Sequence, residues 1–179
     1  MALVNLKSTL LTNRDATPKV LTDAYLSGGI MEEVQGSVKT ANNDNAGSTY
    51  RLVSVPSNAR VSQIYWQADA LGSGCQLDVA VWYPTNLPQG GGAFLASGSA
   101  AAMISSSIFA TALAGSGSAV ALTEITNQSG NYLIPLQETP LWNVLGLATD
   151  PEVPLDLGFS LRFATATAGY AGLKVRYQY

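Results

Sequence analysis

Three runs of alternating apolar and polar residues between Thr49 and Tyr83 constrain the fold most strongly. They cover residues 49–55, 60–70 and 75–83, and the segments Pro-Ser-Asn-Ala and Leu-Gly-Ser-Gly separate them. Because successive side chains of a β-strand point to opposite faces, this alternation predicts strands with one buried face. Proline and glycine in the separating segments favour turns. We therefore expect three consecutive strands that together build the central sheet.

The alternation also assigns residues to faces. In the third run we expect one face to be buried, and Asp78 and Trp82 to lie on the other face and point outward. Cys75 is the only cysteine, so no internal disulfide can form, and we expect it to be a small buried apolar residue. In the second run, one face holds Ile64, Trp66 and Ala68. In the third run, one face holds Cys75, Leu77, Val79, Val81 and Tyr83.

Residues 155–163 and 171–179 alternate in the same way and predict a C-terminal hairpin. The expected register pairs residues whose numbers sum to 334. It places Asp156 diagonal to Arg176 on the exposed face, as a favourable cross-strand pair. The expected buried positions are Leu155, Leu157, Phe159, Leu161 and Phe163 in the first strand and Ala171, Leu173, Val175, Tyr177 and Tyr179 in the second.

The remaining pattern indicates an all-β fold. Roughly eight to ten short strands with many Gly, Ser and Pro breaks are typical of an antiparallel sandwich or barrel, and a jelly roll fits this number. One short helix is predicted over 139–146, with Thr139 as N-cap, Pro140 in its first turn and Gly146 at its end. The other expected strands are Glu33–Thr40 and, with weaker patterns, Ala93–Ser97, Ser105–Ala110 and Ala119–Thr123.

Residues 1–33 form a predicted N-terminal arm, and residues 34–179 the sandwich domain. The arm has no clean period, although a short helical turn could follow Thr17 and Pro18 and end at Gly28 and Gly29. It lacks the basic and apolar regions of a signal peptide. A frayed terminus and an arm that reaches onto a neighbouring subunit are both open interpretations. The apolar arm residues are Val4, Leu6, Leu10 and Leu11.

The charge content is unusually low. Charged residues make up 12% of the chain, about half the usual share, which favours a surface covered by other copies or by a partner. The formal net charge of −3 and the absence of a basic run argue against nucleic acid as a partner. No charged residue occurs between Asp78 and Glu124, but serine and glycine interrupt this stretch. A hairpin or loop packed on a neighbour is favoured there over a membrane segment.

Residues that could perform chemistry are scarce. The chain has no histidine, which excludes the Ser-His-Asp and Cys-His arrangements and most zinc sites. Oxygen-rich segments at 42–45 and 150–152 lack the spacing of an EF-hand. Trp82, with Tyr65 and Trp66 near it, could form a sugar-stacking platform, although such aromatic residues more often belong to a core or an interface. We predict no catalytic, cofactor-binding or metal-binding residues.

The segments 47–84, 140–151 and 172–179 resemble a family of small structural proteins of tailed bacteriophages, the capsid cement or decoration proteins. The resemblance covers about residues 34–179 and does not include the uncharged residues 93–122. The most family-like strings are Tyr50-Arg51, Val55-Pro56-Ser57-Asn58-Ala59-Arg60, the strand that contains Asp78, and the segment from Leu141-Trp142 to Asp150-Pro151.

This resemblance implies a jelly-roll-like antiparallel β-sandwich that assembles as a dimer or trimer. It implies a structural role without cofactors, in which the protein is made in the host cytoplasm, binds the outer surface of the phage head and clamps adjacent major capsid proteins. The residues expected to contact the capsid or another subunit are Val4, Leu6, Leu10, Leu11 and Trp82. Two alternatives are a carbohydrate- or receptor-binding module of a virion spike or tail, and a sandwich-fold hydrolase that uses Asp78.

Overall fold

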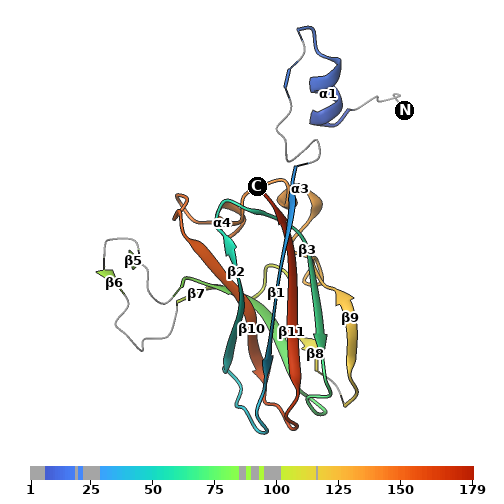
Figure 1. Ribbon diagram of the computed structural model, residues 1–179, viewed down its shortest axis with the longest axis vertical. Helices are drawn as coiled ribbons and strands as arrows, with labels where there is room; N and C mark the ends of the chain where they lie inside the picture. Colours follow the sequence, from blue (N-terminus) through green and yellow to red (C-terminus); the bar gives the residue numbers. More distant parts are fainter. Residues whose placement is uncertain are drawn as a thin grey trace, which may run out of the picture.

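The computed structural model describes residues 7–18, 20–21, 29–84, 88–89, 93–94, 102–115 and 117–179. Two antiparallel sheets pack face to face (Figure 1). We call them the β1 sheet, with order β1-β11-β3-β9, and the β2 sheet, with order β2-β10-β4-β7 and β8 also paired to β4. Their strands are β1 (Met31–Lys39), β2 (Thr49–Pro56), β3 (Arg60–Ala68), β4 (Gln76–Trp82), β7 (Met103–Ser105), β8 (Leu113–Ala114), β9 (Val120–Glu124), β10 (Pro154–Phe163) and β11 (Tyr170–Gln178).

The strand order confirms the jelly-roll prediction. Without the two-residue strands β5 (Pro88–Gln89), β6 (Ala93–Phe94) and β8, eight strands remain among the described residues. In chain order, the first, eighth, third and sixth form the β1 sheet, and the second, seventh, fourth and fifth form the β2 sheet. Apart from β4 and β7, which pair within the β2 sheet, successive strands thus alternate between two sheets that share one core, as in a jelly roll.

The core lies between the two sheets and is built from the alternating inner positions. Trp66 of β3 and Phe159 of β10 join the sheets through an edge-to-face contact, with ring centroids 6.2 Å apart. At one end Tyr132 packs edge-on against Phe109 at 4.7 Å, and its hydroxyl donates to the Val61 carbonyl at 2.7 Å. The predicted burial of Ile64, Trp66 and Ala68 and of Cys75, Leu77, Val79 and Val81 is confirmed.

The predicted C-terminal hairpin is wrong. Strand β10 lies between β2 and β4, whereas β11 lies between β1 and β3 in the opposite sheet. Both strands bury the expected face up to Leu161 and Tyr177, because alternation looks the same in paired and in facing strands. Arg176 therefore pairs with Glu33, and Asp156 with Arg51 at 3.2 Å.

Two further expectations about the strands are also wrong. The stretch from Thr49 to Tyr83 does not form a single sheet, since β3 belongs to the β1 sheet and β2 and β4 to the β2 sheet. Phe163 is exposed because the register of β10 shifts after Leu161, which turns the end of the strand outward. Tyr179 follows the last residue of β11 and is half exposed.

Strand β4 is buried on both faces, so Asp78 and Trp82 are not exposed as predicted, although they lie on the face opposite the core. Trp82 is 2% exposed and Asp78 9%. The reason is that β4 is an interior strand, with β10 on one side and β7 and β8 on the other, and other parts of the chain cover both its faces. Trp82 is therefore absent from the surface that a partner could reach.

The helices are short. Helix α4 (Leu141–Val144) confirms the helix predicted over 139–146, and Gly146, with φ of +73°, follows it as expected. Its N-cap is Pro140 and not Thr139, because the Thr139 hydroxyl donates to the Leu136 carbonyl at the end of helix α3 (Ile134–Gln137). No helix in the described residues is long and apolar enough to cross a membrane.

The arm contains helix α1 (Thr9–Asp15), which lies beyond the end of the sandwich (Figure 1). The Ser8 side chain caps it by accepting from the Leu11 amide at 3.4 Å. The helical turn predicted after Pro18 is not seen at residues 20–21, and residues 22–28 lie outside the described residues. Strand β1 begins at Met31, two residues before the predicted start.

The weaker strand predictions fare unevenly. Strand β9 lies one residue later than the predicted 119–123. Residues 106–109 form bends, so the strand predicted over 105–110 ends at its first residue, as the end of β7. Of the strand predicted over 93–97, the structure shows the first two residues as β6, and residues 95–97 lie outside the described residues.

Candidate interaction surfaces

Asp78 of the hydrolase alternative and Asp150 of the oxygen-rich segment 150–152 both support the fold. Asp78 accepts from the Ala112 amide at 2.7 Å and from the Arg162 guanidinium at 3.3 Å. Asp150 accepts from the Ser57 hydroxyl at 2.5 Å and from the Glu152 amide at 2.9 Å. Within the described residues no group of three or more acidic, histidine or cysteine side chains is placed to hold a metal ion.

The aromatic platform proposed for sugar stacking does not exist as expected. Trp66 and Trp82 are both buried, and they lie in different sheets. Tyr65 is half-buried on the outer face of the β1 sheet, where the Arg176 guanidinium lies 5.5 Å from its ring centre. These three rings therefore cannot present a common flat surface.

An apolar surface lies at the end of the sandwich from which the arm departs. We call it the arm-end surface and define it by five large side chains that are each at least half exposed, namely Ile30, Met31, Leu133, Ile134 and Tyr179. The most exposed are Ile30 at 82% and Ile134 at 73%. Because soluble monomers rarely expose large apolar patches, we treat these exposed side chains as a candidate interaction surface.

Backbone pairing brings the parts of the arm-end surface together. Met31 at the start of β1 pairs with Gln178 at the end of β11, and Gln178 pairs with Arg60 at the start of β3. The Arg60 guanidinium donates to the carbonyl of Glu138, directly after α3. Figure 1 shows the start of β1, the C-terminus and α3 at this end, with α1 beyond them.

The residues predicted to contact a partner lie mostly in the arm. Leu11 is 38% exposed on α1, and Val20 and Leu21 after the helix are also exposed. Val4 and Leu6 lie outside the described residues, as does the side chain of Leu10. No periodic pattern in the sequence marks the arm-end surface, because its residues come from a strand start, a short helix and the last residue.

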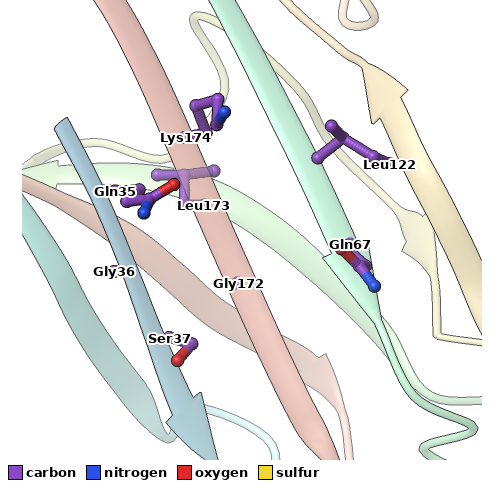
Figure 2. A pocket seen from close by; sticks show the side chains of 8 residues that line it. All are labelled: Gln35, Gly36, Ser37, Gln67, Leu122, Gly172, Leu173 and Lys174. Atoms are coloured by element: carbon purple, nitrogen blue, oxygen red, sulfur yellow. The ribbon is translucent and has the colours of Figure 1, made fainter. Parts of the chain in front are cut away.

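A groove crosses the outer face of the β1 sheet. Gly172 of β11 lies between its cross-strand partners Ser37 of β1 and Gln67 of β3, and it provides no side chain to fill the row. The resulting groove has a volume of about 550 Å³ (Figure 2). We call it the Gly172 groove, and its other lining residues are Gln35, Gly36, Leu122, Leu173 and Lys174.

An ion cluster lies next to the groove. The Glu33 carboxylate binds the Arg176 guanidinium at 2.7 Å and the Lys174 ammonium at 3.0 Å. These two cations, Arg176 first, lower the pKa of Glu33 below its ordinary value of 4.5. The cluster joins β1 to β11 at the edge of the sheet.

Replacing Glu33 by Gln should lower the melting temperature at pH 7, and this difference should disappear in acid. The folded pKa of Glu33 lies below the unfolded one, so its stabilising effect is present above pH 4.5 and is lost as the pH falls through the folded pKa. Melting curves between pH 2 and pH 7 would measure this. The control Glu124→Gln removes a carboxylate without an ion pair in the described residues and should leave the melting temperature at pH 7 unchanged. A constant difference for Glu33→Gln at all pH values would contradict the prediction.

Comparison with known proteins yields structural likeness only. No model of a protein family matches the chain, and no curated protein matches it. A chain of the "Capsid of Ralstonia phage GP4" is similar in structure with a TM-score of 0.55, at 17% identity over 84% of each chain. A chain of the "Cyanophage Pam1 capsid asymmetric unit" aligns with a TM-score of 0.45, at 16% identity over 84% of this chain and 86% of that chain. The first likeness shows that the fold of this chain recurs in a phage capsid structure.

Proposed function

We propose that this chain is a structural protein of a tailed-phage virion that binds the outside of the head as a cement or decoration protein. The observation that carries the proposal is the structural likeness to a chain of the Ralstonia phage GP4 capsid, which extends over 84% of both chains. The resemblance of residues 47–84, 140–151 and 172–179 to phage cement proteins supports the same role.

The arm-end surface and the arm are the proposed attachment region. Both expose large apolar side chains, and burial of apolar area stabilises a contact by about 25 cal/mol per Å². A head must hold its joints against the pressure of the packaged DNA, and a protein that lies across a joint adds buried area there. The proposed partner is the major capsid protein, with this chain present as a dimer or trimer on the head exterior.

Imaging of the intact particle tests the proposal directly. Virions of the encoding phage would be purified, and electron cryo-microscopy would locate the sandwich in the map. We expect regularly spaced copies on the outside of the head, with the arm-end surface toward the shell. Copies found only on the tail or on a spike, or virions without this chain, would refute the proposed role.

Deletion of residues 1–16 should lower the affinity of the protein for phage particles by at least about tenfold, which corresponds to about 1.4 kcal/mol. The particles used are ones that carry no copies of the protein. The melting temperature should stay the same, because α1 lies beyond the sandwich. Co-sedimentation with particles would measure bound copies.

A pair of point variants separates the arm from the arm-end surface. Ile134→Ser removes an exposed apolar side chain of the arm-end surface and should also weaken attachment. Met103→Ser removes an exposed apolar side chain on β7, at the edge of the β2 sheet and outside the arm-end surface, and should not. Saturation of the particles by the truncated protein at wild-type concentration would show that the arm has no part in attachment.

A further inference from the structure

The Gly172 groove has the size of a ligand site. A second hollow of about 210 Å³ shares Ser37, Gln67 and Gly172 with it and extends to Asp69 and Tyr170. The two hollows therefore adjoin each other at Gly172, which has no side chain. Ligand sites in proteins commonly have volumes of roughly 300–1,000 Å³, and the groove of about 550 Å³ falls within this range.

The polar groups of the groove are free to bind a ligand. Its exposed lining includes the carboxamides of Gln35 and Gln67 and the hydroxyl of Ser37, which can all both donate and accept hydrogen bonds. Within the described part of the chain, none of these three side chains hydrogen-bonds to another residue. Figure 2 shows them on the two strands that flank β11, on either side of Gly172. A ligand rich in groups that both donate and accept would match them.

The charge around the groove is balanced. Four cross-strand rows include or adjoin it, and they hold three cations and three carboxylates, so their formal charges sum to zero. Lys174, the charged residue of the groove lining, already binds Glu33. A charged ligand would gain little here, which favours a neutral one. The charged residues of the four rows are Lys39, Lys174 and Arg176 and Glu33, Asp69 and Glu124.

We propose that the Gly172 groove binds a neutral saccharide. Sugar hydroxyls donate and accept, as the side chains of Gln35, Ser37 and Gln67 do. The C–H faces of a sugar ring need apolar contacts, and Leu122, which is 54% exposed, provides one on the β9 wall. This binding activity is separate from the proposed attachment to the head, since the groove lies on a sheet face and the arm-end surface at one end of the sandwich.

Titration of the full-length protein with neutral oligosaccharides tests the proposal. The probes are oligomers of glucose, galactose, mannose and N-acetylglucosamine, and NMR would follow the backbone amides. We expect saturable shifts centred on Ser37, Gln67 and Gly172. Gly172→Leu fills the groove and should weaken binding by at least about tenfold. A Cβ atom at Gly172 would meet no atom closer than 3.5 Å, so the variant should fold.

The matched control is Gly117→Leu, which makes the same substitution where an added Cβ meets nothing within 4 Å, and it should bind as wild type does. If Gly172→Leu does not fold, the double variant Gln35→Ala, Gln67→Ala should give the same loss. The proposal is overturned if no neutral probe binds, if only charged saccharides bind, or if binding survives the variants. It is also overturned if the wild-type protein binds no saccharide and the variant Gly172→Leu no longer attaches to particles. The groove would then be a contact with another protein.

Discussion

Replacing Phe159 by Ala should lower the free energy of unfolding by about 3–5 kcal/mol. Phe159 is fully buried on β10, and its ring meets Trp66 of the facing sheet at 6.2 Å. Its removal leaves a cavity between the two sheets and takes away the contact that joins them. Denaturant unfolding, followed by tryptophan fluorescence, would measure the change.

Phe163 on the same strand is the matched control. Alternation places Phe163 on the face of Phe159, but the structure leaves it 53% exposed after the register shift in β10. Phe163→Ala should therefore change the free energy of unfolding by less than about 1 kcal/mol. Equal losses for the two variants would mean that β10 continues regularly to its end and that the register shift is absent.

Replacing Gly36 by Ala should destabilise the protein by about 2–3 kcal/mol. A Cβ atom at Gly36 would lie 2.2 Å from the Leu52 carbonyl oxygen, far inside contact distance. Gly36 belongs to β1 and Leu52 to β2, so this close approach joins the edges of the two sheets. The backbone of one strand has to move to admit the methyl group. Thermal and denaturant unfolding would report the loss.

Gly172→Ala makes the same change one strand away and should be neutral or stabilising by up to about 1 kcal/mol, because glycine weakens the interior of a strand. An added Cβ at Gly172 points into the open groove. If both variants were equally stable, the two sheets could not approach as closely as Gly36 and Leu52 indicate. If both variants were equally unstable, there would be no space for a side chain at Gly172, and the groove proposed to bind a saccharide would not exist.

Much of the fold follows from local patterns. The period of two in residues 60–68 and 171–177 identifies the buried face, and Ile64, Trp66, Leu173 and Val175 are indeed in the core. Proline and glycine mark the ends of strands and of α4 for steric reasons that need no tertiary context. These signals sufficed for an all-β sandwich and for the jelly-roll prediction.

The candidate surfaces were less accessible to sequence reasoning. Ile30, Ile134 and Tyr179 belong to segments far apart in the chain, and only the pairing of β1, β11 and β3 gathers them at one end. Alternation between Ala171 and Leu173 places Gly172 on the outer face, but a groove requires short side chains on the neighbouring strands as well. Whether Ser37 and Gln67 lie beside it depends on the register of both pairings.

Alternation along the sequence identifies which residues of a strand share a face, because it is a property of a single extended chain. Composition alone excludes histidine chemistry and an internal disulfide, since the chain has no histidine and a single cysteine. Which strands are neighbours depends on the tertiary fold. Strands β10 and β11 carry the same pattern whether they pair or face each other, and burial on both faces of β4 depends on the segments that pack over it. Pairing and packing depend on residues far apart in the sequence. For this reason alternation alone predicted Trp82 as an exposed contact residue although it is buried, and it could not predict the arm-end surface or the Gly172 groove.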